Sequence, residues 1–155
     1  MTAPGTATPE QRLDAYTAAG APLALDEVLA FFDGLPAVAP EEMIGEWDGA
    51  LVPTGHPGEA MLDRLRWAGK TFRGPDDVDP IVCLDDAGER EASPVMGAAT
   101  LRRVEFRDVV TATMVYDEHP VFDHFRRVSA GAVIGVMDRK GEAHPLVFCL
   151  RRRAG

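Results

Sequence analysis

Apolar residues recur at helical spacing in the first part of the chain and alternate with polar residues in the last third. Leu25, Leu29 and Phe32 share one face at helical spacing, which predicts a short amphipathic helix. Residues 43–53 alternate loosely and predict a strand. A second short helix is predicted within residues 58–69. A hairpin turn needs only a few residues, so we expect this second helix to cover an opening.

From residue 99 onward, segments rich in Val, Phe, Ile, Tyr and Thr follow one another, each bounded by a turn signal. Their spacing of about 10–12 residues is typical of an antiparallel sandwich or barrel. With the earlier strands the count reaches about eight, which closes into a barrel wide enough for side chains or one small ligand. The pattern therefore predicts a mainly β protein, a single antiparallel barrel with an N-terminal helix and a lid helix after the first strand.

The 155 residues are the usual size of one domain. Residues 1–22 are rich in Thr, Ala, Pro and Gly, which predicts a flexible tail. We expect residues 23–155 to form the barrel domain. Within it, residues 43–74 carry the first strand and the lid, and residues 99–153 form a C-terminal antiparallel meander.

The formal net charge of −9 disfavours nucleic acid as a partner, because phosphates require an excess of Lys and Arg. No apolar run approaches the roughly 20 residues of a membrane span. The first residues lack a basic cluster followed by an apolar block, so we expect a cytoplasmic protein without a secretory signal. The oligomeric state, a homodimer included, is left open by the sequence.

Cys83 and Cys149 lie in apolar runs, and we expect two buried, reduced core cysteines. A disulfide requires that their two strands be neighbours. No second Cys or His lies at ligand spacing, so no metal site is predicted. No glycine-rich phosphate loop or Ser-His-Asp arrangement stands out, and no cofactor is predicted.

The stretch from Gly45 to Gly49, GEWDG, is followed by LVPTGHP, RWAGKTF, VEFRDVVTATMVYDEHPVFDHFRRV, GVMDRKG and FCLRRR. This combination resembles the bacterial GXWXG family, whose members carry a C-terminal domain of unknown function. The resemblance covers residues 25–153 and implies a fold more than an activity. The G-x-W element is also similar to the opening of lipocalins and other calycins, and nitrobindin-like barrels open in a related way. It implies that Trp47 packs across the closed end, while Gly45 and Gly49 let the strand bend. No nitrobindin-type haem ligand is found.

The segment MVYDEHPVFDHFRRV holds the densest group of titratable side chains. If its two halves are paired strands, Asp123 and Phe125 share one face, and His124 and Arg126 share the other. The alternation does not decide which face points into the barrel. A solvated hairpin is the simpler interpretation. The candidates for acid or base catalysis are His56, Tyr116, Asp123, His124 and Glu105, and the simpler roles of His56 and Glu105 are an exposed turn and a surface ion pair.

Aromatic rings, flexible thioethers and a lysine are the candidate contacts of a bound molecule. They are Trp67, Lys70, Met114, Phe125 and Met137. Trp67 either packs in the core or lines the mouth.

Three functions are consistent with these residues. The first is binding of a small hydrophobic or aromatic molecule inside the barrel, without catalysis. The second is an enzyme on the same barrel, a cofactor-independent isomerase, cyclase or lyase that uses acid/base chemistry on a hydrophobic metabolite. The third is an interaction protein whose barrel is filled by its own side chains. The sequence favours the first and does not name the ligand.

Overall fold

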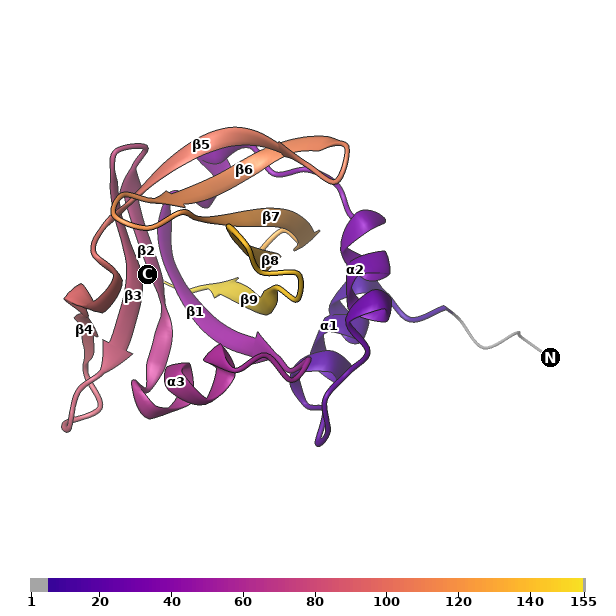
Figure 1. Ribbon diagram of the computed structural model, residues 1–155, viewed down its shortest axis with the longest axis horizontal. Helices are drawn as coiled ribbons and strands as arrows, with labels where there is room; N and C mark the ends of the chain where they lie inside the picture. Colours follow the sequence, from indigo (N-terminus) through magenta and orange to yellow (C-terminus); the bar gives the residue numbers. More distant parts are fainter. Residues whose placement is uncertain (1–5, 155) are drawn as a thin grey trace.

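The computed structural model describes residues 6–154, and nine strands run through this part of the chain. The strands are β1 Gly45–Val52, β2 Trp67–Gly74, β3 Asp77–Leu84, β4 Arg90–Ala92, β5 Ala99–Phe106, β6 Val109–Tyr116, β7 Val121–Ser129, β8 Ala132–Arg139 and β9 Leu146–Arg152. They form one antiparallel sheet in the order β2-β1-β9-β8-β7-β6-β5-β3-β4, and β2 also pairs with β3. That additional pairing closes eight strands into a ring, so the predicted barrel is confirmed (Figure 1).

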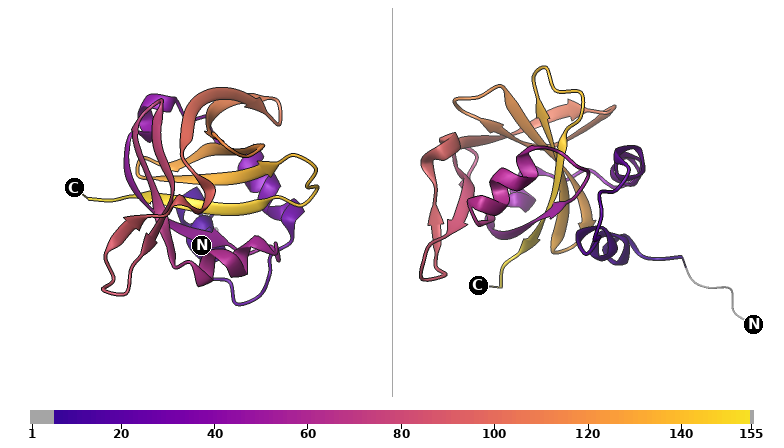
Figure 2. Two further views of the ribbon diagram at one scale, coloured as in Figure 1. Left: turned by 60° about the vertical axis from the view of Figure 1, so that its left-hand side comes forward. Right: turned by 60° about the horizontal axis from the view of Figure 1, so that its bottom comes forward.

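The short strand β4 lies outside the ring and pairs only with β3 among the described strands. The hairpin that joins them projects from the barrel (Figure 2, left). The strand pairing around the ring is weakest between β3 and β5, which share a single residue pair, Val78 with Ala99. The amide of Leu101 donates to the carbonyl of Pro75 at 2.7 Å and extends this junction.

Alternate residues along the strands form two apolar clusters, one inside the barrel and one outside. The inner cluster contains Trp47, Phe72, Leu101 and Phe125. The outer cluster joins β8 and β9 to two helices, α1 Pro9–Thr17 and α2 Leu25–Asp33. Both helices lie against the outside of the barrel (Figure 1).

The helix α1 occupies part of the segment for which the sequence predicts a flexible tail, so that prediction is wrong for residues 9–17; residues 1–5 lie outside the described part of the chain. Thr8 and Gln11 form a reciprocal capping box at its start. Leu13 and Tyr16 are buried, and the rings of Tyr16 and Phe31 meet edge to face at 5.3 Å. A helix with only two buried residues leaves little periodic signal, which is why composition misled the prediction.

The predicted lid helix is present as α3, Gly58–Arg64, but it is shorter than expected. Arg66 adopts a left-handed conformation with φ of 54°, and Trp67 then begins β2. Trp67 is therefore a strand residue, although it lies within the range predicted for the helix, residues 58–69. Seen from the bottom of Figure 1, α3 lies across one end of the barrel (Figure 2, right).

Trp47 is buried, and its indole Nε1 donates to the Met43 carbonyl at 2.8 Å. The Arg152 guanidinium lies 4.3 Å from the ring centroid. A side chain at Gly49 would meet the indole ring of Trp67 at 2.3 Å, so this glycine makes room for a second tryptophan. The two glycines of the motif thus allow close approach at the start and in the middle of β1, and Gly45 also has φ of 132°.

Both cysteines are free: Cys149 is buried, whereas Cys83 is only partly buried. Their strands, β9 and β3, are not neighbours in the sheet. No helix within residues 6–154 combines the length and the apolar character needed to cross a membrane.

Candidate functional site

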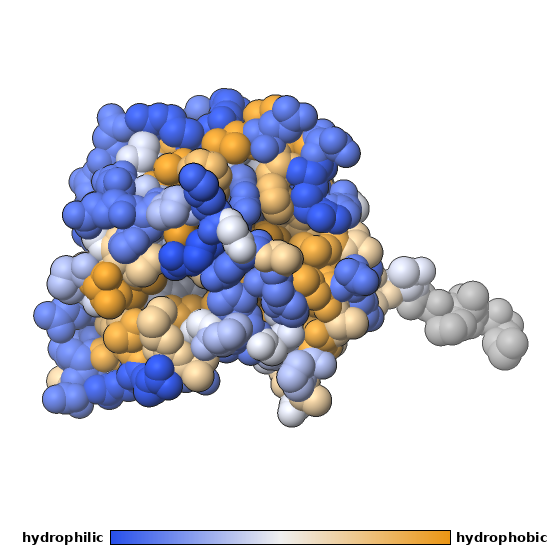
Figure 3. Space-filling view, viewed as in Figure 1, coloured by the Kyte–Doolittle hydropathy of each residue, from blue (hydrophilic) through white to orange (hydrophobic). Residues whose placement is uncertain are grey.

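A cavity of about 950 Å³ lies inside the barrel at the end covered by α3. This volume is within the range of roughly 300–1,000 Å³ that is usual for small-molecule sites. Figure 3 shows apolar residues gathered beside a hollow on this face of the molecule. The lining residues come from α3 and the loop before it, from several strands and from the β8–β9 loop. The cavity therefore depends on closure of the ring and on the lid together.

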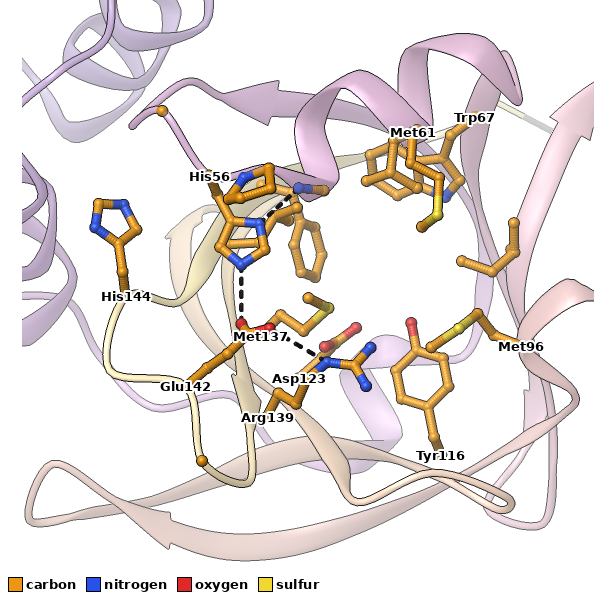
Figure 4. Close-up of a pocket in the computed structure, with 18 of the residues that line it drawn as sticks. His56, Met61, Trp67, Met96, Tyr116, Asp123, Met137, Arg139, Glu142 and His144 are labelled. Carbon is orange, nitrogen blue, oxygen red and sulfur yellow. Dashed lines mark hydrogen bonds and ion pairs between the residues drawn. The ribbon is translucent and has the colours of Figure 1, made fainter.

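Most of the wall is apolar (Figure 4). Met61 of α3, Trp67 of β2, Met137 of β8 and, in the segment between β4 and β5, Met96 face the space. Phe148 of β9 meets the Trp67 ring edge to face at 5.7 Å. Thioethers are flexible and polarizable, so this wall can adapt to irregular apolar shapes.

The polar part of the wall is built around Lys70 and Asp123. Lys70 lies on β2 and Asp123 on β7, and these strands are opposite one another in the eight-stranded ring. Lys70 Nζ lies 3.2 Å from Asp123 Oδ2, and the two residues are 2% and 1% exposed. The ammonium also donates to the Pro80 carbonyl at 3.0 Å. The ion pair therefore spans the barrel interior and forms part of the cavity wall.

Three aromatic rings surround the amine of Lys70. Nζ lies 5.0 Å from the centroid of Phe148, 5.6 Å from that of Trp67 and 5.8 Å from that of Tyr116. Such distances allow attraction between a cation and the ring faces. The rings thus stabilise the protonated amine in a place where water does not.

Burial perturbs each ionisable group of this cluster. Burial lowers the pKa of Lys70, although the Asp123 charge opposes the shift. Burial raises the pKa of Asp123, although Lys70 and the Tyr116 hydroxyl favour the carboxylate. The pKa of Tyr116 is raised well above its usual value by burial and then by the Asp123 charge. The pKa values of the amine and the carboxyl therefore move toward each other, as in many proton-transfer sites.

The hydrogen-bonding capacity of the cluster is not filled. Within residues 6–154, neither Asp123 oxygen has a hydrogen bond of normal geometry, although the Lys70 amine and the Tyr116 hydroxyl both lie beside the carboxylate. The indole Nε1 of Trp67 is also buried without an acceptor in this part of the chain. Such groups cost free energy unless a partner is supplied, so the cavity wall is incomplete without one.

A polar rim closes the mouth above this cluster. His56 Nδ1 accepts from the Gly58 amide at 2.9 Å, and its Nε2 donates to Glu142 Oε1 at 2.8 Å. The hydrogen of the neutral ring therefore sits on Nε2. Glu142 Oε2 lies 3.5 Å from the Nε atom of Arg139. These contacts tie the β8–β9 loop to the segment that enters α3.

Two family models match consecutive parts of the chain. The GXWXG protein family matches residues 30–88, and the domain of unknown function DUF4334 matches residues 97–152. A crystal structure of a protein from Thermomonospora curvata is 37% identical, covers 94% of this chain and 99% of its own, and superposes with a TM-score of 0.87. The chain belongs to the GXWXG family. No curated protein shows significant similarity to it.

In this GXWXG protein, the predicted catalytic candidates fall into two groups. Tyr116 and Asp123 line the cavity together, and His56 lies at its rim. His124 and Glu105 do not line it. Of the predicted ligand contacts, Trp67, Lys70 and Met137 line the cavity, whereas Met114 and Phe125 are buried in the inner cluster away from it. The structure therefore places three of the five predicted contacts in the cavity wall and two in the apolar core.

The outward face of β7 holds His124. Its ring stacks on Phe106 with centroids 3.9 Å apart and planes 5° apart, and Nδ1 lies 2.9 Å from the Thr113 hydroxyl. Burial lowers the pKa of His124, although the nearby Asp138 carboxylate opposes the shift. This histidine is therefore a packed residue of the outer layer, and Asp123 takes the inward position.

Arg139 and Glu142 belong to the site of this GXWXG protein but were not predicted. Arg139 lies two residues after Met137 on β8, so the two side chains share a face of the strand, and the alternation could have predicted that Arg139 lines the cavity. Glu142 lies in the loop between β8 and β9, where no alternation could have predicted its position. Within residues 6–154, no group of three or more His, Cys, Asp or Glu side chains is arranged to hold a metal ion.

Proposed function

We propose that this protein binds a small, mainly apolar molecule inside its barrel. The observation that carries the proposal is the cavity of about 950 Å³, whose wall is apolar except for one buried polar cluster and a polar rim. Sites of this size and composition suit a ligand whose apolar body packs on the wall while a few polar atoms fix its orientation. A barrel filled by its own side chains would leave no such volume, so the cavity argues against a purely structural interior.

The test is the mass of the protein purified from its own host, measured under native conditions. We expect a co-purified small molecule, which denaturation releases. A cavity-filling variant, Met137→Trp, should lose that mass, because its indole would occupy the space beside Asp123. The matched control is Val110→Trp, which adds the same ring at a position 55% exposed on β6. An apo mass, together with no thermal shift across a panel of apolar compounds, would contradict the proposal.

A second candidate function is acid/base catalysis on a bound hydrophobic molecule, such as isomerisation, cyclisation or elimination. It is favoured by the Lys70–Asp123 distance of 3.2 Å within the cavity wall, with Tyr116 beside the pair. Asp123 would accept a proton, and the Tyr116 hydroxyl would donate to an oxygen on which charge develops. The rim residue His56 has both ring nitrogens engaged, so it is a weaker candidate for proton transfer.

Deuterium incorporation distinguishes catalysis from binding. If the protein only binds, the molecule recovered from it after incubation in heavy water carries no new carbon-bound deuterium. If Asp123 removes a proton from carbon, deuterium appears there, and Asp123→Asn abolishes the exchange while the molecule still binds. Exchange that survives in Asp123→Asn would assign the chemistry to another group.

A further inference from the structure

We infer that the molecule held in the cavity is electrically neutral and carries a hydroxyl group, as an alcohol or a phenol, that donates a hydrogen bond to Asp123. The inference rests on the proposed binding function and names the polar end of the ligand. It is carried by the charge balance of the wall and by the unfilled hydrogen-bonding capacity of the cluster.

The charges on the described cavity wall already have partners. Lys70 pairs with Asp123 at 3.2 Å, and Arg139 lies 3.5 Å from Glu142. One cation and one anion stand in each pair, so the wall offers no uncompensated charge to a ligand. A charged ligand would lose its hydration and gain no counter-ion, and an unpaired buried charge is strongly unfavourable. A neutral molecule avoids this cost.

Asp123 then selects the kind of neutral group. Its side chain points into the cavity in Figure 4, and within residues 6–154 neither oxygen has a hydrogen-bond partner of normal geometry. A carboxylate only accepts hydrogen bonds, so a ligand group that binds to it must be a donor. Ethers, ketones and hydrocarbons have no such donor. A hydroxyl has one, and it can also accept from a neighbouring O–H or N–H.

Tyr116 also lines the cavity and offers a donor for that second contact. Tyr116 directs its hydroxyl toward the cavity in Figure 4, and the indole Nε1 of Trp67 is buried without an acceptor in the described part of the chain. One hydroxyl group of the ligand can therefore donate to Asp123 and accept from the Tyr116 hydroxyl. A protonated amine also donates, but the Lys70 ammonium at 3.2 Å from Asp123 would repel it.

The test is titration calorimetry of the full chain, stripped of bound molecules, with probes that share one apolar body. The aliphatic probes are decanol, methyl decyl ether, decanoate and decylammonium, and the aromatic probes are para-hexylphenol and para-hexylanisole. We expect the hydroxyl probe of each series to bind about tenfold or more tightly than its methyl ether, as for a hydrogen bond to a charged group. In the double variant Lys70→Met with Asp123→Leu, the ether should still bind and the preference should fall to near one.

The outcomes separate the two proposals. Equal affinity for the hydroxyl probe and its ether in the wild-type protein overturns this inference and leaves the binding function standing. Tighter binding of decanoate or decylammonium than of decanol overturns it as well, because the wall would then accept a charge. Failure of every probe to bind counts against the binding function itself. If the double variant does not fold, Asp123→Asn takes its place, and an undiminished hydroxyl preference there overturns the role of the carboxylate.

Discussion

The buried pair of Lys70 and Asp123 makes the sharpest prediction about stability. Removing one partner, in Lys70→Met or in Asp123→Leu, leaves the other charge buried and unpaired. We expect each single variant to lower the free energy of unfolding by about 3–5 kcal/mol at neutral pH. The double variant should be as stable as the wild-type protein or more stable, by up to about 4 kcal/mol, because neither charge is then buried. The cavity beside the pair gives the larger leucine room.

The magnitude follows from the geometry of the pair. At 3.2 Å the attraction between the charges is about 5 kcal/mol with an effective dielectric constant of about 20. Removing both ions from water costs several kcal/mol for each, and the hydrogen bonds that normally offset this cost are missing at Asp123 in the described part of the chain. The attraction therefore does not exceed the desolvation cost, although it is lost entirely when one partner is removed.

Urea denaturation followed by tryptophan fluorescence measures the four free energies of this double-mutant cycle. The matched control is the exposed pair Arg66–Asp86, whose atoms lie 2.8 Å apart. Its variants should leave the urea midpoint almost unchanged, because surface ion pairs are screened by solvent. The reasoning is refuted if the double variant loses as much stability as the two single variants together, since the charges would then be independent.

The same variants should respond to pH in opposite directions. The pKa of Asp123 is raised by burial, so its stabilising form is the protonated one, present near pH 4 and lost as the pH rises through the raised pKa. The pKa of Lys70 is lowered by burial, so its stabilising form is the neutral one, lost as the pH falls through the lowered pKa. Lys70→Met should therefore lose stability as the pH rises above the ordinary pKa of a carboxyl group, and Asp123→Leu as the pH falls below the ordinary pKa of an amine, each by up to about 1.4 kcal/mol per pH unit. Parallel slopes in the two variants would contradict the assignment.

Two further predictions concern the first strand pair and the mouth. Gly69 has φ of 151°, and a Cβ there would lie 1.9 Å from the Trp47 carbonyl oxygen, so Gly69→Ala should cost about 3 kcal/mol or more in urea denaturation. Gly74→Ala is its control, because a Cβ there has nothing within 4 Å, and a similar loss in both would refute the explanation. Glu142→Gln weakens the contact with His56 that holds the mouth together, so ligand release measured by stopped flow should accelerate by up to about fivefold. Unchanged release would show that the ligand leaves by another route.

The local pattern of apolar and polar residues was sufficient to predict the closed antiparallel barrel. Val-, Phe- and Thr-rich segments at regular spacing predicted the antiparallel strands, and their number predicted closure. Leu25, Leu29 and Phe32 predicted α2, because an amphipathic helix buries one stripe of its surface. The GEWDG stretch located the start of the barrel. These features are readable because each depends on residues that are close in sequence.

Only the tertiary structure decided what the interior contains. The alternation in β7 left two equal faces, and Asp123 took the inward one because the opposite face carries His124 and Arg126, which α2 and Phe106 cover from outside. The pairing of Lys70 with Asp123 joins strands that are distant in sequence and opposite in the ring. No local pattern encodes that distance, since it arises only when closure of the sheet sets which residues face one another across the barrel.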